Sequence, residues 1–166
     1  SFKGDEDGTT EIELPNEWGG QTELYKAVKG LRVSTKNASI TDSASLHLKT
    51  VAHRPGEKLT VEYTLAQDFA GPLKNDVRYR PVVQADHIHW IGYTVLVRPK
   101  WKDDEKIKVT FSWHELPKSW TLADSYGTGG RKRDARIKFE DLGRTITVAG
   151  DFRLTNTAAA GKPVAV

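Results

Sequence analysis

The chain has 166 residues, contains no cysteine, and carries a net charge of +3 from 25 basic and 22 acidic side chains. This length suits one domain and is too short for two of ordinary size. The lack of cysteine excludes disulfides, thiolate catalysis and cysteine-ligated metal sites. No apolar run is long enough to cross a bilayer, so we expect no membrane span. Because the positive charge is modest and mixed with acids, we also expect no nucleic-acid partner.

Hydrophobic residues alternate with polar ones along much of the chain. The alternation is longest in 58–65 and in 106–113, and it recurs in 11–14 and in 45–49, around Leu46 and Leu48. A period of two places one set of side chains in a core and the other set in solvent, as in half-buried β-strands.

Two later segments refine this pattern. Residues 87–97 are apolar on both alternating faces, which predicts a strand covered on both sides that ends before Pro99. The apolar pairs of 137–139 and 146–148 flank 141–143, which predicts a hairpin turn. Only 22–29 has helical spacing. The predicted fold class is therefore all-β, an antiparallel β-sandwich or curved stacked sheets with at most one short helix.

The same pattern divides the chain into three parts. We expect residues 1–10 to be a flexible lead, 11–155 a single β domain, and 156–166 a tail that ends before a further strand or a catalytic domain. Within the domain, the longest predicted loop is 125–134, which is rich in glycine. It contains most of the basic run Arg131, Lys132, Arg133 and Arg136, which we interpret as a solvated loop rather than a phosphate site.

Histidine offers two candidate metal sites, and neither is complete. His114-Glu115 cannot open a His-Glu-x-x-His zinc helix, because position 118 is lysine and Pro117 disfavours the helix. His87 and His89 share a strand face, but a catalytic zinc needs at least three protein ligands. We therefore predict no metal site, no cofactor and no catalytic residue in this chain.

The chain has five tryptophans, an unusual number for a small β protein. Trp113 and Trp90 follow apolar strand positions and are predicted core residues. Trp18, Trp101 and Trp120 lie near turns, where they either close the ends of the sandwich or stack on sugar rings. A carbohydrate- or peptidoglycan-binding β-sandwich module is therefore the alternative function.

Several phrases of the chain, taken in order, resemble one enzyme family. They combine aromatic residues with proline or glycine in 12–20, 58–63, 88–92, 97–99, 111–120, 123–127 and 149–153. These phrases resemble the N-terminal β domain of the glycyl aminopeptidase family of zinc metallopeptidases (metallopeptidase family sixty-one), distant relatives of aminopeptidase N. The resemblance runs from about Glu11 to the end of the chain.

The resemblance implies a modular enzyme in which this chain is a non-catalytic domain. A catalytic domain with a His-Glu-x-x-His zinc site would follow this domain in the parent enzyme. The partners of this chain would then be that catalytic domain and the peptide substrate of the parent enzyme. Zinc is implied for the missing domain only. The resemblance also implies an extracytoplasmic location, periplasmic or secreted. We place Trp120 and Tyr126 nearest the boundary with the catalytic domain, because both lie in a stretch rich in loops.

Overall fold

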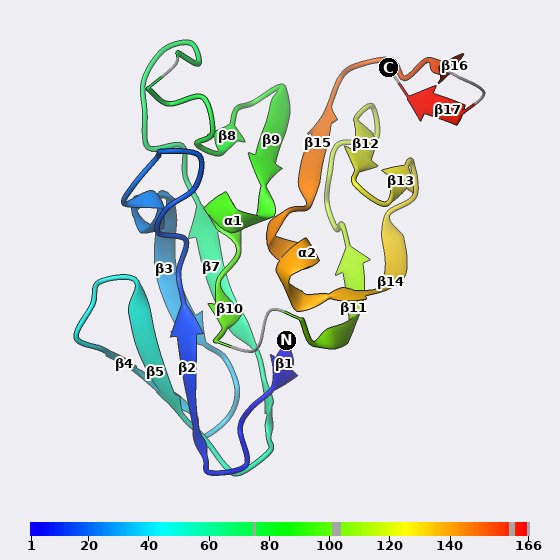
Figure 1. The fold of residues 1–166 in the computed structure, drawn as a ribbon. Helices are drawn as coiled ribbons and strands as arrows, with labels where there is room; N and C mark the ends of the chain where they lie inside the picture. Colours follow the sequence, from blue (N-terminus) through cyan, green and yellow to red (C-terminus); the bar gives the residue numbers. More distant parts are fainter. Residues whose placement is uncertain (75, 101–103, 160–161, 166) are drawn as a thin grey trace.

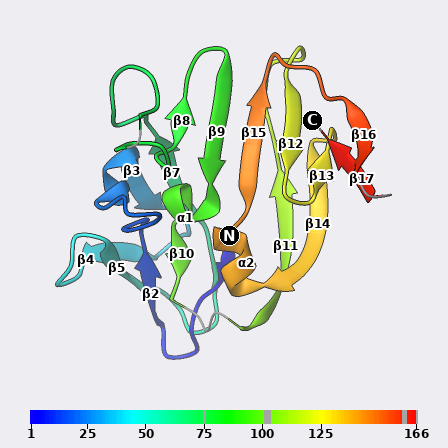
Figure 2. The ribbon, with the colours of Figure 1, turned by 45° about the horizontal axis from the view of Figure 1, so that its top comes forward.

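The computed structural model describes residues 1–74, 76–100, 104–159 and 162–165. It confirms the all-β prediction, since the chain forms antiparallel sheets with short helices between them. The strands gather in two groups that lie side by side in both views (Figures 1 and 2). The first group contains the strands of residues 2–65 together with 98–99, and the second contains those of 82–91 and 106–150. Within the described ranges, no helix is long and apolar enough to cross a membrane.

The first group is built on a four-stranded sheet that two strand pairs cover. The sheet has the order β10 (Arg98–Pro99), β2 (Thr9–Glu13), β5 (Leu48–Ala52) and β4 (Ser39–Asp42). The pairs are β3 (Val28–Val33) with β7 (Val61–Leu65) and β1 (Phe2–Lys3) with β6 (Lys58–Leu59). A core of Ile12, Val51 and Leu59 joins the sheet to the pairs, and all three residues are fully buried.

The N-terminal residues belong to this packed group. β1 pairs with β6, opposing Phe2 to Leu59, and Phe2 packs against the core. β2 then begins at Thr9, so the segment predicted as a lead runs directly into the first sheet. In the predicted tail, β16 (Asn156–Ala159) pairs antiparallel with β17 (Lys162–Ala165).

The second group consists of a five-stranded sheet and a two-stranded ribbon. The sheet has the order β13 (Gly127–Thr128), β12 (Thr121–Asp124), β15 (Ile146–Gly150), β9 (His87–Ile91) and β8 (Val82–Val83). The ribbon pairs β11 (Lys106–Ser112) with β14 (Lys132–Lys138) along their whole lengths.

Aromatic rings connect the ribbon to the sheet. The rings of Trp90 and Trp113 lie 6.0 Å apart, and those of Phe111 and Tyr126 lie 5.4 Å apart. The sheet register puts Trp90 on the same face as the buried Leu122 and Ala149. The ribbon therefore covers this face, and the second group is a small sandwich.

The described part of the chain contains three short helices, whereas the sequence predicted at most one. The 3-10 helix η1 (Leu24–Ala27) lies where the helical spacing predicts it. The predicted strand of 87–97 stops at Ile91 and turns into α1 (Gly92–Val95), and the predicted hairpin turn of 141–143 is instead part of α2 (Phe139–Gly143). Both interpretations were wrong. The hairpin fails because α2 carries the chain from the ribbon to the five-stranded sheet, which a hairpin cannot do.

Close packing of the two α-helices explains where the strand stops. A Cβ atom at Gly92 would clash with the carbonyl oxygen of Leu142 and lie 2.9 Å from that of Gly143. The Gly92 N–H also donates to the carbonyl oxygen of Thr145 at 2.7 Å. Glycine therefore allows α1 to meet the α2 backbone directly, between the two groups of strands.

The basic run is also placed differently from its prediction as a solvated loop. β14 begins at Lys132, so most of the run lies on a strand. Arg133 points to the inner face of the ribbon, where it forms an ion pair with Asp124, while Lys132 and Arg136 are exposed on the outer face. The interpretation failed because it treated neighbouring cations as equivalent, whereas a strand sends alternate side chains to opposite faces.

Candidate functional site

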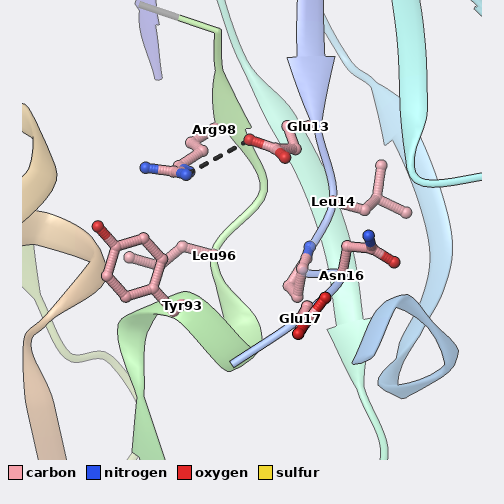
Figure 3. Close-up of a pocket in the computed structure, with 8 residues that line it drawn as sticks. Glu13, Leu14, Asn16, Glu17, Tyr93, Leu96 and Arg98 are labelled. Carbon is pink, nitrogen blue, oxygen red and sulfur yellow. Dashed lines mark hydrogen bonds and ion pairs between the residues drawn. The ribbon is translucent and has the colours of Figure 1, made fainter. Parts of the chain in front are cut away.

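A small cavity of about 140 Å³ opens where the first group of strands meets α1 (Figure 3). Its wall comes from two segments far apart in the sequence, the end of β2 with its following loop and the stretch from α1 to β10. The lining residues are Glu13, Leu14, Pro15, Asn16, Glu17, Tyr93, Leu96 and Arg98.

Backbone hydrogen bonds fix the loop on one side of the cavity. The N–H of Leu14 donates to the carbonyl oxygen of His47 at 2.7 Å, and the carbonyl oxygen of Asn16 accepts from the N–H of Leu24 at 3.1 Å. Trp18 and Gln21 exchange two further hydrogen bonds. Leu14 and Pro15 are buried, whereas Glu17 is exposed at the rim.

Arg98 connects the two sides of the cavity. Its Nη2 lies 3.4 Å from Oε2 of Glu13, the contact drawn as a dashed line in Figure 3. Its guanidinium carbon lies 5.0 Å from the ring centre of Tyr93 and 5.6 Å from that of Phe139. Such distances allow cation–π attraction to both rings. Arg98 therefore holds β2, α1 and α2 together.

Trp18 extends this aromatic cluster outward. Its ring stacks on Tyr93 with centroids 4.6 Å apart and an interplanar angle of 16°. One face of the indole is therefore already covered, and Trp18 is half-buried. A sugar ring could stack only on the opposite face. Trp101, another candidate for sugar stacking, lies outside the described residues.

The lining of the cavity combines charged, polar and apolar groups. Two carboxylates, one amide and one guanidinium surround a floor of leucine and proline, and none of the lining residues is serine, cysteine or histidine. The cavity can offer hydrogen bonds and charge to a polar chain segment.

The two residues predicted to lie at a domain boundary flank β12 at opposite ends. The N–H of Trp120 donates to the carbonyl oxygen of Pro117 at 3.1 Å, which closes the turn before β12. Tyr126 follows β12, stacks on Phe111, and has its hydroxyl 3.4 Å from that of Thr145. The structure therefore does not bring the two residues into one site, and Tyr126 is part of the sandwich packing.

The histidines of β9 share one face, as their spacing predicts. Nδ1 of His87 lies 2.8 Å from Oδ1 of Asp86, and this hydrogen bond lowers the pKa of the Asp86 carboxyl. Burial lowers the pKa of His89, with a smaller contribution from His87. In the part of the chain that the structure describes, no group of three or more histidine, aspartate or glutamate residues could hold a metal ion.

Sequence reasoning did not single out Tyr93, Asn16 or Arg98 as site residues. A signal was nevertheless present, since the phrases that carried the family resemblance include 15–18 and 97–99. The structure brings these two phrases to the same cavity. Their nearness depends on β10 pairing with β2, which no local pattern reveals.

The fold is similar to part of a known protein. A crystal structure of an aminopeptidase N family protein from Idiomarina loihiensis superposes with a TM-score of 0.72 at 17% sequence identity. The match covers 98% of this chain and 28% of that one, so this chain spans little more than a quarter of that protein's length. At this identity the likeness shows the fold alone. No protein-family model matches the chain, and no curated protein matches it either.

Proposed function

We propose that this chain is the non-catalytic N-terminal β domain of a zinc-dependent aminopeptidase of the glycyl aminopeptidase family. It packs on a catalytic domain and helps to shape the peptide cleft of that domain. The observation that carries the proposal is the structural match, in which nearly the whole chain superposes on little more than a quarter of an aminopeptidase N family protein. The sequence phrases that resemble the glycyl aminopeptidase family support the narrower assignment.

The zinc of such an enzyme does not fit the residues present here. His114 is followed by Glu115 but not by a second histidine at position 118, and the described ranges contain no candidate cluster of metal ligands. The proposal therefore assigns zinc, and every step that uses it, to the catalytic domain. In this proposal, the chain only packs on the catalytic domain and helps to shape its peptide cleft.

Trp120 is the better probe of the domain boundary. It is half-buried, and no aromatic ring stacks on it within the described ranges. Tyr126 already packs on Phe111, so its loss would also loosen the sandwich. An effect of Trp120→Ala on the enzyme would therefore report on the boundary more directly.

The test measures peptidase kinetics of the full-length enzyme that carries Trp120→Ala or Tyr126→Ala. We expect a higher KM or a lower kcat, because the cleft wall would shift. Tyr126→Phe is the matched control, since it keeps the ring contact with Phe111 and removes only the hydroxyl. Unchanged turnover and unchanged affinity in both alanine variants would remove these residues from the boundary.

Two further measurements test the assignment as a whole. The purified 166-residue chain should hydrolyse no peptide with or without added zinc, and zinc-dependent hydrolysis would contradict the proposal.

Calorimetry against a panel of polysaccharides tests the alternative of a carbohydrate-binding module. Saturable binding that Trp18→Ala abolishes would favour that alternative, whereas we expect no binding.

A further inference from the structure

The positive charge of the chain is concentrated on one face of the β11–β14 ribbon. The outward side chains of the ribbon alternate with the inner apolar ones and are all exposed. They carry five cations and one carboxylate, a net charge of +4, which leaves −1 for the rest of a chain whose total is +3. We call this surface the basic face. Its charged residues are Lys106, Lys108, Lys132, Asp134, Arg136 and Lys138.

Strand register places like charges directly opposite each other on the basic face. Lys106 faces Lys138, and Lys108 faces Arg136. Like charges in directly opposed positions destabilise a β-sheet. Within the described ranges, none of the five cations forms an ion pair with an acid. The ribbon therefore holds repelling charges that it does not neutralise internally.

The single carboxylate of the basic face is already engaged. Oδ1 of Asp134 accepts a hydrogen bond of 2.6 Å from the hydroxyl of Thr110 in the opposite strand. An open hollow of about 440 Å³ lies between this pair and the neighbouring Lys108–Arg136 row, with Val109 and Ala135 as its other lining residues. An anionic group could enter this hollow beside two cations.

The composition of the basic face distinguishes among anionic partners. Protein–protein interfaces are depleted in lysine and enriched in aromatic residues, whereas this face has four lysines and no aromatic side chain. Single-stranded nucleic acids bind through aromatic stacking, which this face cannot supply. Lysine is a flexible point charge, which suits a flat surface of closely spaced anions.

We propose that the basic face docks on an anionic phospholipid surface and so holds the chain at a membrane without crossing it. Basic residues near such a surface each strengthen binding roughly fivefold, and salt screens the attraction. The inner face of the ribbon stays packed on the five-stranded sheet, so docking requires no change of fold.

The test is sedimentation of the 166-residue chain with vesicles of phosphatidylcholine, alone or mixed with phosphatidylglycerol. The ribbon variant changes Lys106, Lys108, Arg136 and Lys138 to glutamine. The matched control removes the same charge from four exposed lysines outside the ribbon. Those lysines are Lys29, Lys36, Lys74 and Lys118.

We expect binding to the phosphatidylglycerol vesicles that 0.5 M salt abolishes, and no binding to phosphatidylcholine alone. The ribbon variant, which lacks four charges worth roughly fivefold each, should bind several hundredfold more weakly, on the order of 600-fold, while the control binds nearly as well as the wild type. Asp134→Asn should strengthen binding severalfold, which tests the face without risk of unfolding. The proposal would be overturned if the ribbon variant and the control lost vesicle affinity equally, or if the wild type did not bind the vesicles. It would also be overturned if the wild type bound duplex DNA more tightly than vesicles at equal phosphate concentration.

Discussion

The ion pair between Asp124 and Arg133 offers a sharp test of how the second group of strands is held together. Oδ2 of Asp124 lies 3.2 Å from Nε of Arg133, and the two side chains are 2% and 16% exposed. Neither atom makes a hydrogen bond, so their contact is electrostatic. Asp124 lies on β12 and Arg133 on β14, so the pair joins the five-stranded sheet to the ribbon.

Removing one partner should be costly because it leaves the other charge buried. Asp124→Ala leaves the guanidinium of Arg133 without its carboxylate partner. It also removes the Oδ1 atom that accepts the Tyr126 N–H at 2.8 Å. Breaking a buried pair in this way costs about 3–5 kcal/mol. For a chain of this length, that loss lowers Tm by roughly 6–20 °C.

The assay is urea unfolding followed by circular dichroism, with the single variants Asp124→Ala and Arg133→Met and the double variant Asp124→Ala/Arg133→Met. The double variant should recover much of the loss, because replacing a buried pair with apolar side chains is often neutral. Glu62→Ala is the matched control, since it breaks the exposed pair with Arg32, whose side chains are 43% and 72% exposed.

The reasoning would be refuted if Asp124→Ala destabilised the chain no more than Glu62→Ala does. It would equally fail if the double variant lost the full sum of the two single losses, since burial of an unpaired charge could then not be the cause.

Three further predictions follow from packing and titration. Gly92→Ala should destabilise the chain by about 1–3 kcal/mol in urea unfolding, because its methyl group meets the α2 backbone. Leu59→Ala should cost about 2–5 kcal/mol in the same assay, because Leu59 is fully buried in the first core. Burial lowers the pKa of His89, so the unfolded chain binds its proton more tightly and stability should fall as pH drops through about 6.5. His89→Gln should flatten the pH dependence of Tm in this range, and an unchanged pH profile would contradict the explanation.

Long alternating segments allowed the strands and their inner faces to be predicted. The segment containing Phe111 and Trp113 forms β11 and its continuation, and both rings pack inward as expected. Alternation failed where it was short. Leu46 lies outside β5 and is 71% exposed, because one apolar residue beside Leu48 does not determine where a strand begins.

The remaining features depend on contacts between distant segments. α1 replaces the end of a predicted strand because α2, about 50 residues later, packs against Gly92. The cavity likewise requires β10 to pair with β2. Sequence alone could name the phrases containing Asn16 and Arg98, but it could not show that they meet.

The two proposals assign different surfaces to different partners, which makes them separable. The basic face points away from the five-stranded sheet, while Trp120 directly precedes β12 of that sheet. In the full-length enzyme, the ribbon variant should therefore keep its peptidase turnover on soluble peptides and lose only its vesicle binding. Trp120→Ala should do the reverse. A ribbon variant that lost turnover while remaining folded would show that the basic face contacts the catalytic domain. The basic face would then be covered and could not dock on a lipid surface.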